Sequence, residues 1–360
     1  MYDPSKILAW LEENVQSMRQ SRRKTLACIV SSAMRMQGTG VLALGRSMEG
    51  PVAAKHRIKR VDRFLGNAKV EVDAVSTVLF HQLRPAQGVV VLADWTDRHA
   101  FQQLVLALPR NGRALPFYAT TVLKGDGSGD MEGSMVQAEA AAIEALARMC
   151  GDAIKPIIIA DRGFGNTRWL EEIEKRGWYF VQRLARNHTV DLELHLGSLE
   201  ELGIRRGWRP RDWGWGTLGN KEWGRVRLVT VFEREAKEAW FLVTNLPHHS
   251  AQQVVKLYTR RMWIEAAFRD LKNRNWGLGM DQAKLTKATR LDRHFLILAL
   301  AYIFLSAFGA AAETAGLGDQ LKANTVPERV LSLARIGNYF LQTAQVPIAY
   351  AMAALLALST

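Results

Sequence analysis

The chain has 360 residues, of which 48% are hydrophobic, and its 48 lysines and arginines outnumber 35 acidic residues to give a formal net charge of +13. This content suffices for one large core with appendages, and the excess positive charge favours nucleic acid as a partner. Zinc is not expected, because the two cysteines, Cys28 and Cys150, match no finger spacing and the eight histidines form no His-Glu-x-x-His pattern.

The N-terminal region, residues 1–75, is expected to be helical and basic. Apolar residues recur there at helical spacing, and the stretch from Arg19 to Lys69 holds twelve lysines and arginines against two acids. In residues 52–65 the apolar face can pack while basic side chains remain available to phosphate: Lys55, Arg57, Lys59, Arg60 and Arg63. We interpret this region as a DNA-binding module with helix-turn-helix-like packing. A solvated charged face is the alternative.

Two short apolar runs share one design. Residues 88–94 and 155–161 each end in Ala-Asp and are too short for a helix, which predicts buried strands at about 88 to 94 and 156 to 160. An aspartate after such a strand emerges where open α/β sheets place ligands, so Asp94 and Asp161 meet if the strands are neighbours. The alternative is that each aspartate merely ends its strand or caps the next element. Further strands are expected at about 100 to 107, 115 to 123 and 239 to 244.

The segment from Tyr258 to Lys272 is predicted to be a helix with one polar face. At about 100° per residue, four polar residues fall within an arc of roughly 60°: Tyr258, Arg261, Glu265 and Lys272. An adjoining apolar arc would be buried, which leaves the glutamate at the edge of a core. The alternative is a surface helix in which Arg261 and Glu265 form an ordinary ion pair one turn apart.

Three carboxylates converging on one point would need a cation. The negative charges of Asp94, Asp161 and Glu265 repel one another and raise their pKa values unless positive charge lies among them. Hard divalent cations prefer oxygen ligands, so the expected metal is Mg²⁺ or Mn²⁺, in an arrangement that serves in-line phosphoryl displacement.

An insertion is expected at residues 190–238. Asp161 and Glu265 lie 104 positions apart, too many for the connections of a compact core. The insertion is rich in tryptophan and arginine, which suits a DNA strand whose bases stack on side chains. Trp213 and Trp215, beside two glycines, are the candidates for this contact. A place in the core of a small sheet is an equally good alternative.

The C-terminal part is expected to pack rather than to span a membrane. Residues 295–312 approach membrane length, but Ser306, Gly309 and their position after the polar helix favour a buried core helix. No basic-then-apolar leader opens the sequence, and cysteine is sparse, so we expect a cytoplasmic protein with no membrane association.

The order Asp94, Asp161, Glu265, with the spacing Tyr-(2)-Arg-(3)-Glu-(6)-Lys, resembles the DDE transposases of bacterial insertion sequences. Specifically, it is similar to the insertion-sequence-four group, which moves DNA by cut and paste. Asp-Trp-Thr from Asp94, Asp-Arg-Gly-Phe from Asp161 and the stretch 240–247 also resemble that group, over about residues 55 to 310.

The resemblance implies an α/β fold with a five-stranded, ribonuclease-H-like mixed sheet. Its core segments would be residues 76–189 and 239–325, around a β-rich insertion at 190–238 and before a helical tail at 326–360. The implied catalytic residues, Asp94, Asp161 and Glu265, would bind two Mg²⁺ ions, for which Mn²⁺ can substitute. Three further residues would hold DNA phosphates: Tyr258, Arg261 and Lys272.

The resemblance also implies partners and a reaction route. The partners would be double-stranded DNA in the form of terminal inverted repeats and target DNA, bound by a homodimer at the bacterial nucleoid. The DNA ends would form hairpins, with an aromatic residue of the insertion holding a flipped base. Two rival functions remain open. One is a metal-dependent nuclease that cuts without joining, and the other is a catalytically silent DNA-binding protein, such as a repressor, derived from a transposase.

Overall fold

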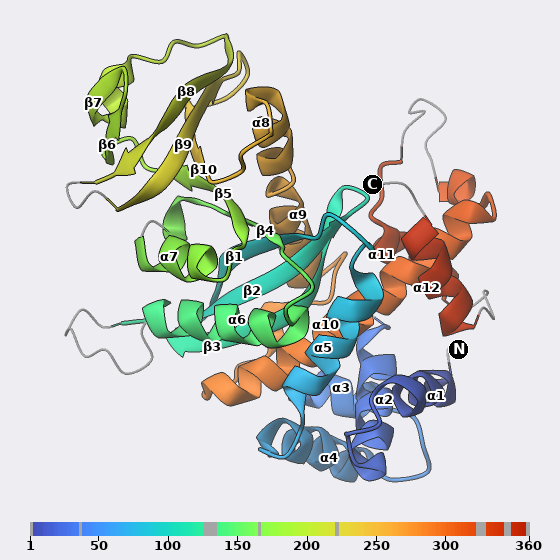
Figure 1. Cartoon of the computed structure of the whole chain (residues 1–360). Coiled ribbons are helices and arrows are strands. Elements are labelled where there is room, and N and C mark those ends of the chain that lie inside the picture. Colours follow the sequence, from blue (N-terminus) through green and yellow to red (C-terminus); the bar gives the residue numbers. More distant parts are fainter. Residues whose placement is uncertain are drawn as a thin grey trace. The chain divides into compact units, whose positions relative to one another are not determined.

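The computed structural model describes residues 3–35, 38–125, 135–164, 167–219, 223–321, 329–341 and 347–357. Contacts divide the chain into two compact units. Unit 1 comprises residues 1–83, 96–132 and 265–360, and unit 2 comprises residues 84–95 and 133–264. Figure 1 labels the helices and strands of both. The domain bounds expected from the sequence divide the chain differently and stay predictions.

The N-terminal part of unit 1 is helical, as expected. Its described helices are α1 Pro4–Asn14, α2 Gln20–Ala33, α3 Val41–Ser47, α4 Ala54–Gly66 and α5 Val72–Leu83. The carboxylate of Asp3 accepts the N–H of Ser5 at 2.8 Å, and Pro4 follows at the first helical position, so α1 begins with two favourable residues. Helix α4 buries Val61, Phe64 and Leu65, which is the amphipathic pattern read from the sequence.

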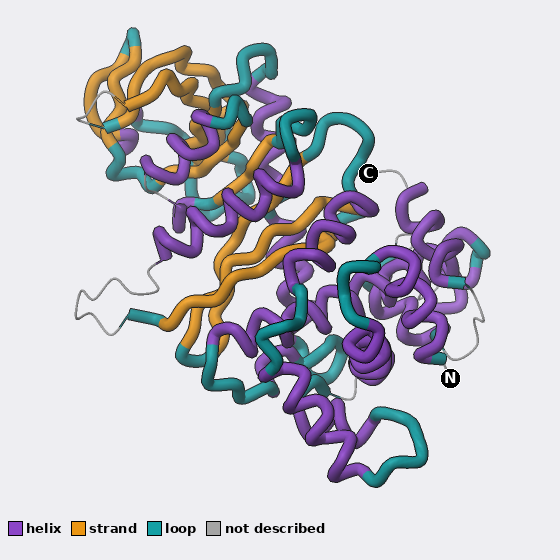
Figure 2. Tube along the Cα trace, turned by 60° about the horizontal axis from the view of Figure 1, so that its bottom comes forward, coloured by secondary structure: helices purple, strands orange, loops and turns teal. Residues whose placement is uncertain are grey.

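The core of unit 1 is built around α10 Ala288–Thr314. This helix packs against α2, α4, α5, the later helices α11 Leu333–Phe340 and α12 Ile348–Ala357, and strand β3 Arg113–Leu123. Strand β3 forms an antiparallel hairpin with β2 Phe101–Arg110. Figure 2 draws the helices in purple and the strands in orange. Two short 3₁₀ helices complete the described part of the unit, η3 Met280–Gln282 and η4 Leu317–Leu321.

Helix α10 is long and apolar enough to cross a membrane by length and composition. All residues from 295 to 312 are nevertheless buried within the protein, as the sequence predicts for a core helix. Its Gly309 lies against the backbone of Leu333, and Gly337 of α11 lies against the backbone of Leu305. A side chain at either glycine would collide with a carbonyl oxygen, so these two helices pack backbone to backbone.

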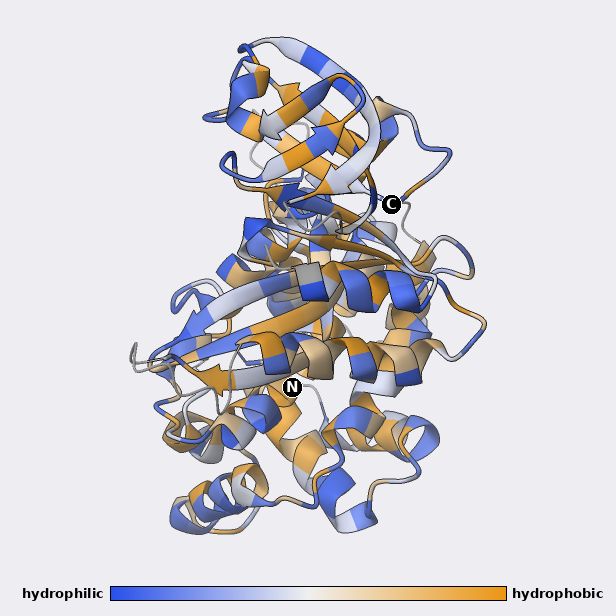
Figure 3. Cartoon of the chain, turned by 60° about the vertical axis from the view of Figure 1, so that its left-hand side comes forward, coloured by the Kyte–Doolittle hydropathy of each residue, from blue (hydrophilic) through white to orange (hydrophobic). Residues whose placement is uncertain are grey.

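Unit 2 contains a large mixed sheet. Its strands, in spatial order, are β1 Val90–Arg98, β4 Ile157–Ala160, β5 Tyr179–Leu184, β10 Trp240–Thr244, β9 Trp223–Phe232, β8 Trp208–Leu218, β6 Thr189–Leu192 and β7 His195–Ser198. Only the part of β1 up to Trp95 belongs to unit 2. The pairs β1–β4 and β4–β5 are parallel, and the pairs from β5–β10 onward are antiparallel. Hydrophilic and hydrophobic residues alternate along the strands at the top of Figure 3.

Helices and turns connect these strands. Unit 2 contains α6 Met135–Cys150, η1 Arg162–Phe164, α7 Thr167–Lys175, η2 Leu199–Leu202 and α8 Ala251–Thr259, together with the first residues of α9 Met262–Lys272. Helix α6 packs on α7, and α8 packs against β5, β8, β9 and β10. This combination of a large mixed sheet and many helices is compatible with a ribonuclease-H-like transposase domain.

The observed sheet contains more strands than the five expected. One additional strand, β5, lies between β4 and the strand at 240–244. Strand β5 was not predicted because it contains Gln182 and Arg183 and therefore lacks the continuous apolar run of β1 and β4. The sheet also does not end after five strands, because β10 pairs with β9 of the insertion. The insertion therefore extends the core sheet rather than standing beside it.

The expected single helix from Tyr258 to Lys272 is also wrong. Helix α8 ends at Thr259 and α9 begins at Met262. Between them, the N–H of Arg261 donates to the carbonyl of Tyr258 at 2.9 Å, and the N–H of Ile264 donates to that of Arg261 at 3.1 Å. These bonds, each from an N–H to the carbonyl three residues earlier, form a tight turn that interrupts the helical pattern. Neither glycine nor proline marks the break in the sequence.

A buried polar network holds α10 to its neighbours in unit 1. The guanidinium of Arg98, which is fully buried, donates to Gln103 Oε1, to the carbonyl of Met280 and to His294 Nδ1, each at 3.2 Å. His294 Nε2 in turn donates to the carbonyl of Thr39 at 2.8 Å, with the tautomer set by the arginine. Burial lowers the pKa of His294 to about 3, so the imidazole is neutral.

Asp292 gives this network a pH dependence. The hydroxyl of Thr121 donates to Asp292 Oδ1 at 2.6 Å, yet burial raises the pKa of Asp292 to about 7. Because the folded pKa lies above the ordinary aspartate value of 3.8, the stabilising contribution of protonated Asp292 is complete at low pH and is lost as pH rises toward 7.

We predict that Asp292→Asn flattens this dependence. The amide stays neutral, so the wild-type loss of stability between about pH 4 and pH 7, which reaches about 1.4 kcal/mol per pH unit for one proton, should be reduced in the variant. Urea unfolding at a series of pH values measures this difference. Parallel stability curves for the two proteins would contradict the prediction. Asp152→Asn, an exposed carboxylate at the end of α6, is the matched control.

Candidate active site

Asp94 and Asp161 lie at the same edge of the unit 2 sheet. Strands β1 and β4 are parallel neighbours, and their last matched pair is Ala93 with Ala160. Asp94 and Asp161 are the residues that follow this pair, so the two carboxylates lie side by side. Asp161 comes directly after β4, whereas β1 continues past Asp94 to Arg98, beyond the strand end expected at residue 94. The pairing that the sequence analysis required for them to meet is present.

One arginine nitrogen joins the two carboxylates. Arg261 Nη2 donates to Asp94 Oδ2 at 3.1 Å and to Asp161 Oδ2 at 2.9 Å. The arginine is only 9% exposed and Asp94 only 6%, so little water screens the interaction. The position of Arg261 depends on the tight turn between α8 and α9, because the residue belongs to neither helix.

Burial controls the protonation of Asp94. Loss of water around its carboxylate raises its pKa to about 6, and the charge of Asp161 adds to the increase. Arg261 and the N–H of Trp95, which donates to Asp94 Oδ1 at 2.9 Å, lower the pKa but do not overcome burial. With a pKa near neutral pH, the protonation of Asp94 changes readily when the positive charge beside it changes.

Backbone and aromatic contacts fix the two acids. The N–H of Gly163 donates to Asp161 Oδ1 at 2.8 Å, in the 3₁₀ turn η1. Gln182 Nε2 donates to the carbonyl of Phe164 at 2.6 Å, which ties that turn to β5. The Phe164 ring lies 6.3 Å from the ring of Trp95. The two sequence motifs that contain the aspartates are therefore in contact through their aromatic residues.

Tyr258 is buried in unit 2. Its side chain has no exposed surface, and its ring meets that of Trp240 edge to face, with centroids 4.9 Å apart. Burial raises its pKa, against the charges of Arg261 and Arg183. Contact with a DNA phosphate, as the sequence predicts, requires this phenol to become accessible.

Glu265 and Lys272 belong to unit 1. Glu265 is exposed on α9 and Lys272 is half-buried. The end of α9 is anchored by Asp270, whose Oδ2 accepts from Arg113 Nε at 3.0 Å and from the Tyr302 hydroxyl at 3.1 Å. The assignment of Glu265 to the same site as the two aspartates stays a prediction from the sequence.

The two aspartates fit a hard cation. Their Oδ2 atoms converge on one positively charged nitrogen, and carboxylate oxygen is the donor that Mg²⁺ and Mn²⁺ prefer. Among the residues that the structure describes, no group of three or more His, Cys, Asp or Glu side chains is arranged to hold a metal. Asp94 and Asp161 are thus two of the three predicted ligands, placed around a point that already favours positive charge.

The predicted DNA-contacting tryptophans are half-buried on β8. Trp213 Nε1 donates to Thr230 Oγ1 at 2.9 Å, and the Arg211 guanidinium lies 4.1 Å above its ring. Arg225 lies 5.3 Å from the centre of the Trp215 ring. Both rings therefore have cationic partners within the insertion. Their contact with DNA stays a prediction.

The predicted basic residues of α4 are displayed away from its buried face. Lys59, Arg60 and Arg63 are exposed and Arg57 is half-buried. Arg60 donates to Thr25 Oγ1 of α2 through Nε at 3.1 Å and Nη2 at 3.0 Å. The arrangement leaves these side chains at the surface of unit 1, and their contact with DNA stays a prediction.

Three charged residues of unit 2 escape the sequence analysis. Arg162 directly follows Asp161, and Arg183 lies close enough to Tyr258 to influence its pKa. Glu238 forms ion pairs with both arginines. Arg162 is part of the Asp-Arg-Gly-Phe motif that follows β4, so the sequence contained a signal that could have identified it. Arg183 lies in the unassigned strand β5, so no sequence signal drew attention to it.

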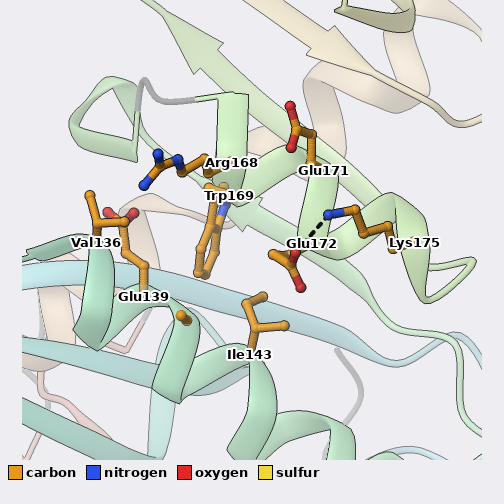
Figure 4. Close-up of a pocket in the computed structure, with 9 residues that line it drawn as sticks. Val136, Glu139, Ile143, Arg168, Trp169, Glu171, Glu172 and Lys175 are labelled. Atoms are coloured by element: carbon orange, nitrogen blue, oxygen red, sulfur yellow. Dashed lines mark hydrogen bonds and ion pairs between the residues drawn. The ribbon is translucent and has the colours of Figure 1, made fainter.

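A separate cavity lies between α6 and α7 (Figure 4). Its volume is about 330 Å³, and it is lined by Glu139 and Ile143 of α6 and by residues of α7 that include Trp169 and Glu172. The predicted catalytic residues do not line it. The ion pair between Glu172 and Lys175, drawn in Figure 4, forms part of its rim.

Comparison with known protein families finds a match. Residues 130–304 match a family model described as a transposase DDE domain. The match supports a DDE transposase. The matched segment contains Asp161 and Glu265 and begins after Asp94. No curated protein matches the chain. The match supports transposase activity in general. Members of this family generally use divalent metal ions and act on DNA.

We predict that Arg261→Met destabilises the metal-free protein in a pH-dependent way. Removing one partner of a buried ion pair costs about 3–5 kcal/mol. The loss should be larger at pH 8, where Asp94 is ionised, than at pH 5, where its raised pKa lets it bind a proton. Thermal melts at both pH values measure the effect. An equal loss at the two pH values would contradict it, and the half-buried neighbour Arg260→Met is the control.

Proposed function

We propose that this protein is a transposase that cuts and rejoins the ends of a mobile DNA element by metal-dependent phosphoryl transfer. The observation that carries the proposal is the meeting of Asp94 and Asp161 on Arg261, four residues before Glu265. The family match over residues 130–304 supports it. The quoted Tyr-Arg-Glu-Lys spacing favours the insertion-sequence-four group within that family.

In this proposal Asp94, Asp161 and Glu265 would hold two Mg²⁺ ions, or Mn²⁺ in their place. When bound, such ions activate water and then a 3′-hydroxyl and stabilise the leaving oxygen. The protein contributes position and charge: the parallel strands β1 and β4 deliver two carboxylates to one point, and burial excludes water around Asp94. The reaction needs no covalent bond between protein and DNA.

Arg261 has two roles in the proposal. In the metal-free protein it neutralises the two aspartates, and a bound cation would take over that task. The guanidinium would then be available for bidentate contact with a phosphate near the cleaved bond. Lys272 is proposed to act as a point charge on another phosphate, and Tyr258 as a further contact once it is accessible.

The remaining parts of the chain have proposed tasks on DNA. The basic helix α4 would contact the inverted repeats through Arg57, Lys59, Arg60 and Arg63. Trp213 or Trp215 of the insertion would hold a flipped base as the DNA end forms a hairpin. We further propose that a homodimer pairs the two ends, in the bacterial cytoplasm at the nucleoid.

We predict that Glu265→Ala retains binding to the element ends but reduces strand cleavage in Mg²⁺ to the background rate, because a metal ligand is lost while the basic surfaces remain. Electrophoretic mobility shift and cleavage of labelled end DNA measure the two properties. Undiminished cleavage would remove Glu265 from the mechanism. The exposed acid Asp152→Asn controls for the change in net charge.

The same DNA assay separates the rival functions. Hairpinned ends followed by joining to a second DNA support the transposase. Cleavage without joining in a two-DNA reaction indicates a nuclease, and specific binding without cleavage in Mg²⁺ or Mn²⁺ indicates a repressor.

A further inference from the structure

An open cleft of about 710 Å³ lies at the ends of β5, β9 and β10 in unit 2. Arg162 borders it from the turn that follows Asp161, and Arg183 borders it from β5. Arg186 and Lys237 add two further cations, against the two acids Glu200 and Glu238. The cleft is therefore lined by a net positive charge and begins one residue from a predicted catalytic aspartate.

Glu238 joins two arginines of this cleft, Arg162 and Arg183. Its Oε1 lies 2.7 Å from Arg183 Nη2, and its Oε2 lies 3.4 Å from Arg162 Nη1. The hydrogen bond from Arg183 holds the pKa of Glu238 below its usual range, so the carboxylate is ionised at neutral pH. Each of its two oxygens thus meets a different guanidinium.

The Glu238 carboxylate contacts two guanidinium groups in the way that a phosphodiester contacts two arginines. A phosphodiester also presents two oxygens that share one negative charge, and guanidinium groups favour such planar or paired oxygen acceptors. Glu238 is about half exposed, with 53% of its side chain accessible, as is Arg162 with 56%. The pair with Arg162 is exposed and contributes little stability, so a phosphate can displace the carboxylate there at small cost. The Arg183 side chain is only 13% exposed, so at that guanidinium a phosphate oxygen has to replace the carboxylate oxygen.

We propose that this cleft binds the phosphate backbone of a DNA strand beside Asp161, and that Glu238 is a built-in competitor that occupies the phosphate position when DNA is absent. The inference rests on the proposed function, because it takes DNA as the substrate. It adds a binding surface, Arg162 with Arg183, and a residue that limits DNA affinity, Glu238.

The test compares Glu238→Gln with wild type in DNA binding. The probe is a fluorescent duplex carrying the DNA that flanks the gene, and fluorescence anisotropy is recorded over a series of salt concentrations. The variant should bind about two- to tenfold more tightly at moderate salt, because two arginines lose their internal partner. The plot of log affinity against log salt should also become steeper, by about one released counterion per phosphate gained.

Glu172→Gln is the matched control. Glu172 also joins two cations, Arg176 at 2.8 Å and Lys175 at 3.0 Å, but it lies on α7 away from this cleft. The control removes the same charge from unit 2, so it reports the general electrostatic effect. A gain for Glu238→Gln beyond that of Glu172→Gln supports the proposal, and equal gains overturn it.

Arg162→Gln gives a second, opposite readout. It should weaken binding and flatten the salt plot, and in the double variant with Glu238→Gln the gain from the glutamate change should shrink. An unchanged gain in the double variant would also overturn the proposal. Methylphosphonate substitution of single phosphates near the cut, which removes their charge, should abolish the extra affinity at one position only.

Failure of this inference is distinguishable from failure of the proposed function. A wild-type protein that cuts and joins DNA, with Glu238→Gln indistinguishable from Glu172→Gln, overturns the cleft alone. A wild-type protein that binds neither duplex nor single-stranded DNA overturns both.

Discussion

The site depends on one positively charged nitrogen held between the buried carboxylate of Asp94 and the partly buried carboxylate of Asp161. Asp94 and Asp161 arrive together because β1 and β4 run parallel in register, and their mutual repulsion would oppose that approach if nothing neutralised it. Arg261 Nη2 supplies the charge at hydrogen-bond distance from both. The surrounding features of unit 2 serve this contact: the η1 turn orients Asp161, the Trp95 and Phe164 rings join the two motifs, and the tight turn after α8 directs the arginine.

Much of this site could be predicted from the sequence, because its determinants are local. An apolar run followed by Ala-Asp is a strong strand signal, and it located both strands and placed Asp161 directly after β4. The same pattern did not show that β1 continues past Asp94 to Arg98. The core helix around residues 295–312 was readable for the same reason, since an apolar stretch of that length has few other solutions. The helical N-terminal region followed from periodicity. In each case the pattern within one segment decided the structure of that segment.

What the sequence could not give depends on partners elsewhere in the chain. Strand β5 carries Gln182 and Arg183, which are tolerated because Gln182 binds the Phe164 carbonyl and Arg183 pairs with Glu238. The break between α8 and α9 contains no breaker residue, so helical spacing placed Tyr258 and Arg261 on the face of a helix that does not continue. Arg261 was expected to face DNA, whereas its contacts in the structure are with the two aspartates. Helical periodicity depends on neighbouring residues, so it does not reveal an ion pair between residues 100 or more positions apart.

The charges at this site are costly, and that cost bears on function. A buried arrangement of one arginine and two aspartates is seldom more stable than apolar residues of the same volume, because the loss of hydration offsets much of the attraction. Burial raises the pKa of Asp94 despite its partner, in keeping with that offset. A protein that needed only a stable sheet edge would be better served by apolar side chains here. The arrangement is accounted for if the positive charge is exchanged during a reaction, so that the arginine keeps the acids together until a metal ion replaces it.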